Sequence, residues 1–295
     1  MRFGAVFPQL DIGPDAAAVA HYATAVEGMG YDFIVAYDHV LGAHPDRPGG
    51  WTGAYTHLSQ FHEPLVLFGF LAGIVKKLEF VTSIIVLPQR QTALVAKQAA
   101  EVDVLSGGRL RLGVGIGWNA VEFEALGERF TNRGRRIEEQ IALMRRLWTE
   151  EVVDFTGRWH RVDRAGLNPM PIRRPIEVWM GGGAEPALRR IARIADGYLS
   201  RESYIRPNDE GRVQLEQLRG WVREAGRDPA TFGIETRLGV ARGFIEEWVK
   251  GAATYQEWGV NAVELNTMNA KLATIDDHLN ALRAFREGVR AAGLG

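Results

Sequence analysis

An aspartate and a histidine stand side by side, Asp38-His39, directly after the apolar residues 33–37. At the C-terminal end of a parallel strand this position faces the usual place of an active site, and an imidazole there can give or take a proton near neutral pH. A second pair, Asp277-His278, lies within a helical pattern, where we expect a solvated surface pair. Location therefore makes His39 the candidate acid or base, with a structural histidine as the equally open alternative.

Three consecutive glycines, Gly181-Gly182-Gly183, separate an apolar strand-like run from a helical stretch that begins near Glu185. Glycine lets a ligand approach the backbone, and the N–H groups at a helix start attract phosphate. The alternative is a tight turn that needs positive φ. The segment 182–184 is thus a candidate phosphate loop, although Pro186 replaces the third glycine of a dinucleotide fingerprint.

Alternating glycines also follow the predicted strand at residues 110–114, in Gly113-Val114-Gly115-Ile116-Gly117-Trp118-Asn119. Trp118 stands where a dinucleotide fingerprint would require its third glycine. The pattern is consistent with a flat surface against which a planar ring could lie. It is equally consistent with a corner of a barrel where glycine stands in place of larger side chains.

The composition excludes several classes of function. The chain has no cysteine, so thiolate nucleophiles, disulfides and iron–sulfur sites are absent, and redox chemistry would need a bound cofactor. Lys and Arg (35) nearly cancel Asp and Glu (36), which argues against nucleic acid as a partner. The histidines lack metal-ligand spacing, and the apolar runs are too short for a signal peptide or a membrane span. We expect a cytoplasmic protein.

Strand-like and helix-like segments alternate along the chain, and together they predict one domain over residues 1–295. The predicted strands are residues 3–7, 33–37, 78–87, 110–114, 176–180, 197–200, 233–238 and 262–266. The predicted helices are residues 15–28, 92–105, 133–148, 185–194, 208–225, 245–258 and 276–291, the last with a possible capping box at Thr274 and Asp277. Eight such units favour a closed α/β barrel, the (β/α)8 or TIM barrel, over an open parallel sheet.

Two segments interrupt this alternation, at about residues 41–61 and 150–175. The first is rich in glycine, proline and aromatic residues, and the second contains three prolines. Because barrels keep their active-site loops in such insertions, we expect both to contribute to a substrate pocket.

Several motifs together resemble the coenzyme F420-dependent branch of the luciferase-like monooxygenase superfamily. They are Arg2-Phe3-Gly4, Gly30-Tyr31-Asp32-Phe33, Asp38-His39-Val40, Gln91-Thr92-Ala93 through Ser106-Gly107-Gly108-Arg109, Gly115-Ile116-Gly117-Trp118-Asn119, Met180-Gly181-Gly182-Gly183 and Ala195-Asp196-Gly197. The resemblance spans most of the chain in the correct order and weakens after about Ser200. It implies a bacterial-luciferase-like barrel, a homodimer and a small-molecule substrate.

The resemblance also implies roles for individual residues. His39 would be the acid or base, and Asp38 would contact the deazaflavin ring. A non-proline cis peptide between Ser83 and Ile84 would back the ring, Gly115, Gly117 and Asn119 would line the cofactor cleft, and Gly182, Gly183 and Ala184 would hold the phosphate. Trp118 replaces a glutamate found in members that oxidise sugar phosphates, which puts that substrate class in doubt.

The implied reaction is hydride transfer between coenzyme F420 and an alcohol, carbonyl, imine or activated alkene. The protein would bury the ring, place the substrate and move the proton. An FMN-dependent two-component monooxygenase is the nearest alternative, and a non-catalytic flavin-binding protein is the alternative of a different class.

Overall fold

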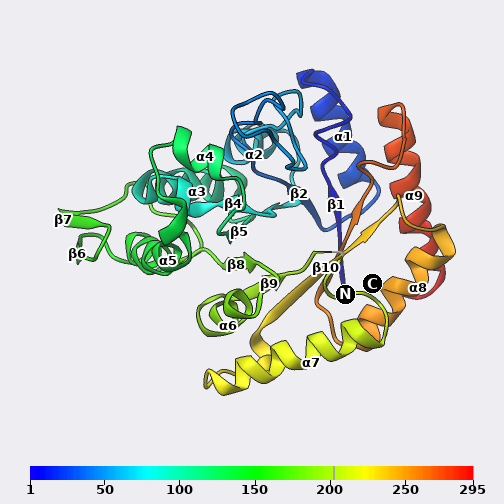
Figure 1. Ribbon diagram of the computed structural model, residues 1–295. Helices are drawn as coiled ribbons and strands as arrows, with labels where there is room; N and C mark the ends of the chain where they lie inside the picture. The colour runs from blue at the N-terminus through cyan, green and yellow to red at the C-terminus, as the bar shows by residue number, and fades with distance from the viewer. Residues whose placement is uncertain (202, 295) are drawn as a thin grey trace.

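Eight parallel strands form a closed ring in the computed structural model, which describes residues 1–201 and 203–294 (Figure 1). In order around the ring they are β1 (Arg2–Val6), β2 (Phe33–Ala36), β3 (Glu79–Thr82), β5 (Leu110–Gly115), β8 (Val178–Gly181), β9 (Gly197–Leu199), β10 (Gly233–Gly239) and β11 (Ala262–Asn266). Pairing of β11 with β1 and of β3 with β5 closes the ring. The predicted barrel is confirmed, and an open sheet is excluded.

The predicted strand at residues 78–87 is divided into β3 and the short β4 (Ile85–Val86). Between them the Ser83–Ile84 peptide is cis, as the resemblance implies. The ladder continues past this point, because β4 pairs with the end of β5 through Ile85 and Val86.

Helices surround the ring of strands (Figure 1). They are α1 (Ala16–Gly28), α2 (Pro64–Ile74), α3 (Thr92–Ser106), α5 (Arg133–Thr149), α6 (Glu185–Ile194), α7 (Asp209–Glu224), α8 (Ile245–Glu257) and α9 (Ile275–Ala291). A short helix, α4 (Ala120–Ala125), and the 3-10 turns Leu87–Gln89, Phe130–Asn132 and Pro229–Thr231 lie in the connections. Helix α2 was not predicted, because its sequence is apolar on nearly all sides and contains two glycines, which leaves no helical periodicity to read.

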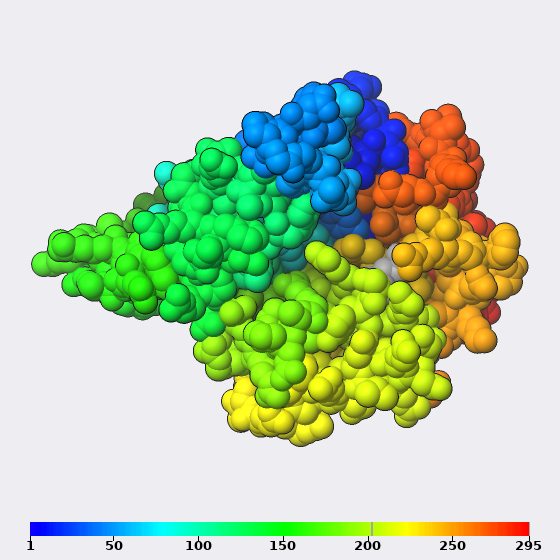
Figure 2. Space-filling view, viewed as in Figure 1, coloured from blue at the N-terminus to red at the C-terminus, as the bar shows by residue number. Residues whose placement is uncertain are grey.

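The two insertions differ in structure and in place. Residues 41–61 have no long regular element and form a lobe on the surface (Figure 2). The ring of Trp51 in this lobe stacks on the ring of Trp118. Residues 150–175 contain the antiparallel hairpin β6 (Val153–Thr156) and β7 (Arg161–Ala165), which projects away from the strands.

The second insertion is not part of the pocket described below, so that expectation was wrong. It follows helix α5 rather than a strand, and its His160 binds Glu139 of α5 and Thr92 of α3 through distances of 2.8 and 2.7 Å. The hairpin is therefore fastened to the outer helices.

Side chains on the strands alternate between the helices and the barrel interior. The outward set builds the main core with the helices, and the inward set includes Phe33, Val35, Val81 and Trp179. The interior also holds buried charges, among them Arg111 between the rings of Phe33 and Trp179.

His278 is a second correction to the sequence analysis. Its side chain is 1% exposed, and Nδ1 lies 2.7 Å from the Thr267 hydroxyl, so it is a core histidine rather than a solvated one. Asp277 does cap α9 with Thr274, as the motif predicted. In the ranges 1–201 and 203–294, no helix is both long enough and apolar enough to cross a membrane.

Candidate functional site

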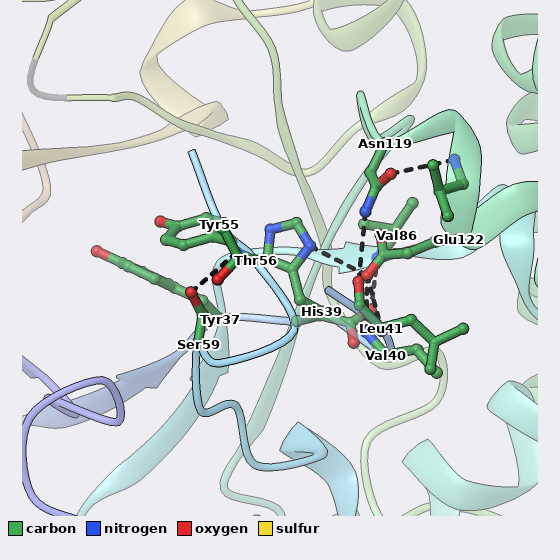
Figure 3. A network of polar contacts seen from close by, with 12 residues as sticks. Tyr37, His39, Val40, Leu41, Tyr55, Thr56, Ser59, Val86, Asn119 and Glu122 are labelled. Atoms are coloured by element: carbon green, nitrogen blue, oxygen red, sulfur yellow. Dashed lines mark hydrogen bonds and ion pairs between the residues drawn. The ribbon is translucent and has the colours of Figure 1, made fainter. Parts of the chain in front are cut away.

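His39 lies just beyond the C-terminal end of β2, with one edge of its ring held by Glu122 of α4 (Figure 3). The distance from His39 Nδ1 to Glu122 Oε1 is 3.1 Å, and the two side chains are 10% and 1% exposed. The same carboxylate oxygen accepts the backbone N–H groups of Val40 and Leu41. Glu122 therefore fixes both the imidazole and the chain that leaves the strand.

These contacts determine which nitrogen of His39 can accept a proton. Glu122 Oε1 already accepts two backbone N–H groups, so the hydrogen of its contact with His39 comes from Nδ1. In the neutral ring Nε2 then has the free lone pair, on the edge of the ring that faces Tyr55 (Figure 3). This arrangement suits Nε2 to proton transfer.

Aromatic rings surround the imidazole. The centroids of Tyr55, Phe61 and Trp118 lie 4.9, 4.8 and 5.5 Å from that of His39. Beside it is a cavity of about 240 Å³, lined by residues 39–42 and by five residues between Tyr55 and Phe61. The first insertion thus supplies the pocket wall that we expected of it, and no lysine or arginine is among the lining residues.

Asp38 is not among the residues that line this cavity, and its side chain is 1% exposed. Arg90 donates to both carboxylate oxygens, at 2.6 and 3.2 Å, and the Val86 N–H donates at 2.9 Å. Arg90 also pairs with Glu63. In this structure Asp38 ties β4 to the end of β2, and the direct contact with a ring that the resemblance implies stays a prediction.

Ile84, the second residue of the cis peptide, lies over the glycines of two neighbouring strands. A Cβ added at Gly115 would be 2.8 Å from Ile84 Cδ1, and one added at Gly181 would be 3.0 Å from Ile84 Cγ2. The space above Gly115 therefore holds a side chain of the protein, which corrects the picture of a bare flat surface.

Gly117 and Asn119 shape the connection between β5 and α4. Gly117 adopts φ of 66°, a left-handed conformation that favours glycine. Asn119 is buried, its Oδ1 accepts the Val121 N–H, and its Nδ2 donates to the Leu41 carbonyl. Both residues place Glu122 and the first insertion around His39, and the cofactor contact that the resemblance implies for them stays a prediction.

The loop 182–184 leads into α6 with properties that fit a phosphate. Its glycines do not have positive φ, so the alternative of a strained turn is excluded. A Cβ at Gly183 would meet only the Tyr204 ring, at 3.5 Å, and no side chain caps the helix at Ala184. Neither backbone nor packing requires glycine at position 183, which is consistent with space kept for a ligand.

Glu122 and Arg90 are the site residues that sequence reasoning missed. Glu122 lies three residues after Asn119, the last residue of the glycine motif. An acidic residue in the first turn of a helix usually suggests capping or an interaction with the helix dipole. Its contact with His39 crosses 83 positions, so no local pattern reveals it.

Comparisons with known proteins agree with this architecture. The family model described as luciferase-like monooxygenase matches residues 1–283. An uncharacterised protein of Mycobacterium tuberculosis (strain ATCC 25618 / H37Rv) is 30% identical over 280 residues, which are 91% of this chain and 93% of that protein. An FMNH2-dependent dimethylsulfone monooxygenase of Pseudomonas fluorescens (strain Pf0-1) is 33% identical over 54% of this chain and 43% of its own length.

Among solved structures, an F420-dependent secondary alcohol dehydrogenase in complex with an F420–acetone adduct superposes with a TM-score of 0.78. At 18% sequence identity over 98% of this chain and 99% of that one, the superposition shows a shared fold. With the family model covering nearly the whole chain, the protein belongs to the luciferase-like monooxygenase family.

Proposed function

We propose that this protein is an oxidoreductase that transfers a hydride between coenzyme F420 and a small organic substrate, with His39 as the acid or base. The observation that carries the proposal is the His39–Glu122 pair, which leaves Nε2 ready for a proton beside an aromatic cavity at the active end of the barrel.

The residues present fit a cofactor that has a flat ring and a phosphate. The cradle at Gly182, Gly183 and Ala184 offers backbone N–H groups at a helix N-terminus, where anions are stabilised. Ser83 and Ile84 lie at the same end of the barrel and would support the ring. When bound, a deazaflavin supplies a hydride donor or acceptor.

The chain would then do three things. The loop before α6 binds the anionic tail, the first insertion encloses the substrate and excludes water, and His39 Nε2 gives or takes the proton at the substrate oxygen or nitrogen. The cavity lining contains no lysine or arginine, so no lining side chain is placed to pair with a substrate phosphate.

A second candidate is an FMN-dependent monooxygenase supplied with reduced flavin by another protein. The observation in its favour is the identity with FMNH2-dependent monooxygenases from two Pseudomonas species. Those relatives match only about half of this chain, so we keep the F420 enzyme as the first proposal.

Titrating the protein with F420 and with FMN, followed by absorbance and fluorescence, separates these candidates. We expect tighter binding of F420, and reduced F420 should be oxidised by some member of a panel of ketones, imines and activated alkenes. Exclusive binding of FMN would replace the first proposal by the second.

His39→Ala should lower kcat by about 10² to 10⁴-fold, the usual contribution of general acid–base catalysis, with little change in the cofactor dissociation constant. His21→Ala, at an exposed position on α1, is the matched control and should behave as wild type. Full turnover by His39→Ala across the pH range would reject His39 as the proton-transfer residue.

A further inference from the structure

Arg237 spans the barrel interior near the end where His39 lies. It projects from β10, pairs with Glu264 of β11, and its Nη2 lies 3.2 Å from the Ser83 hydroxyl, which follows β3. Four strand-to-strand steps separate β10 from β3 in either direction around the ring, so the side chain reaches from one wall to the opposite one. Its guanidinium carbon is also 4.6 Å from the centroid of the Tyr37 ring, which follows β2.

This arginine lies at one end of a series of buried charges. Next in the barrel interior are Glu264 and Glu235, and then Arg111. Arg111 Nη1 lies 2.7 Å from Glu235 Oε2, and Arg111 Nε lies 3.2 Å from Glu79 Oε2. The series ends at Arg2 on the opposite mouth of the barrel, where its side chain is 46% exposed. Counting Arg173, whose Nη1 lies 3.7 Å from Glu79, four guanidinium groups face the three carboxylates.

Charge compensation is weaker at the Arg237 end. Burial raises the pKa of Glu264 to about 7 even with Arg237 beside it, and burial also raises the pKa of Glu235. Burial alone would lower the pKa of Arg237, but the ion pair with Glu264 raises it above its usual value. Arg237 therefore keeps its charge, while burial opposes the negative charge of the two carboxylates beside it, and positive charge is favoured at this mouth.

We infer that Arg237 is a positioning residue for the cofactor ring, and that it stabilises the form of the ring that has lost a proton and carries negative charge. This rests on the proposed function, because it requires a flavin or deazaflavin ring near Ser83. Both the F420 ring and the reduced FMN ring can carry one delocalised negative charge, so the inference holds for either cofactor.

The chemistry of arginine suits this place in the barrel interior. A guanidinium stays charged where a lysine ammonium can lose its proton, and its planar shape lets it contact Glu264, Ser83 and the Tyr37 ring at once. An opposite charge within about 6 Å favours the charged form of a titrating group by about one to three pKa units.

The test is the acidity of the bound ring, measured from its absorption spectrum as pH is varied. The probes are F420 and chemically reduced FMN, each with wild type and variants. Binding to wild type should increase the ionisation constant of the ring, and Arg237→Met should decrease it about tenfold or more relative to wild type. Arg237→Lys should be intermediate, and Glu264→Gln, which keeps the guanidinium, should leave the bound ring at least as acidic as in wild type.

Two controls keep the test decisive. The double variant Arg237→Met/Glu264→Gln replaces the ion pair by neutral groups, so it avoids an unpaired buried carboxylate and should give the same loss of acidity as the single variant. Arg161→Met on the exposed β7 should have no effect. An unchanged ring acidity in folded double variant would overturn the role of Arg237, whereas failure of wild type to bind either probe would remove the proposed function and this inference with it.

Discussion

At the scale of residues, the two members of the Asp38-His39 pair serve different purposes. The Asp38 carboxylate accepts hydrogen bonds from Arg90 and from the Val86 N–H. His39 lines a cavity, and Glu122 holds one edge of its ring. Adjacent polar residues at a strand end point in different directions, so a dipeptide in the sequence need not act as a unit. The partner that orients His39 comes instead from α4.

Glu122→Gln tests that orienting role. The amide keeps the size of the side chain but can donate as well as accept, so it no longer fixes which nitrogen of His39 carries the hydrogen. We expect kcat to fall, by less than the loss that His39→Ala causes, with KM little changed. The exposed Glu124→Gln on the same helix is the control.

A purely structural role for Glu122 would give a different result. Loss of packing alone should lower the melting temperature and the amount of folded protein without changing kcat per folded molecule. An unchanged kcat in folded Glu122→Gln would therefore contradict the orienting role.

At the scale of elements, the sequence predicted those parts of the fold that local patterns specify. All eight strands were found because buried parallel strands are continuous apolar runs, and α9 was found with its cap because Thr274 and Asp277 are close in the chain. Helix α2 was missed because its sequence lacks helical periodicity in its apolar residues. The β6–β7 hairpin was missed because it is positioned by contacts of His160 with two helices that are distant in the sequence.

For the candidate site, too, the sequence predicted the parts that local patterns specify. Patterns located the residues that end or follow strands, including His39 and the 182–184 loop, while the cis peptide came from the resemblance. Contacts that cross the barrel, such as Arg237 with Ser83 over 154 positions, depend on closure of the sheet and leave no local signal.

Gly183→Asp tests the loop before α6 as the phosphate site. The backbone at position 183 has no positive φ and a Cβ there fits, so the variant should fold with an unchanged melting temperature. Its carboxylate would repel the cofactor phosphate and should raise the dissociation constant by at least about tenfold. Gly220→Asp, on α7 with open space around its Cβ, is the matched control. Wild-type affinity in folded Gly183→Asp would remove this loop from the site.

At the scale of the whole molecule, one end of the barrel carries the candidate chemistry while part of the outer surface is apolar. Helix α2 exposes Val66 and Phe70, at 68% and 45%, and the neighbouring α3 exposes Leu94 at 52%. Val66 and Phe70 are one helical turn apart and share a face. Exposed apolar side chains on neighbouring helices are typical of an interface, and we propose that a second copy of the chain covers them, as in the homodimer that the resemblance implies.

Val66→Glu/Phe70→Glu should therefore convert a dimer into a monomer. Light scattering after size exclusion should give about twice the chain mass of 32.7 kDa for wild type and one chain mass for the variant, because burying two unpaired carboxylates in an interface costs several kcal/mol. Val213→Glu, equally exposed on α7, should leave the mass unchanged. A wild-type monomer at micromolar concentration, or a variant that remains dimeric, would place any interface elsewhere, and α2 would then owe its apolar surface to another partner.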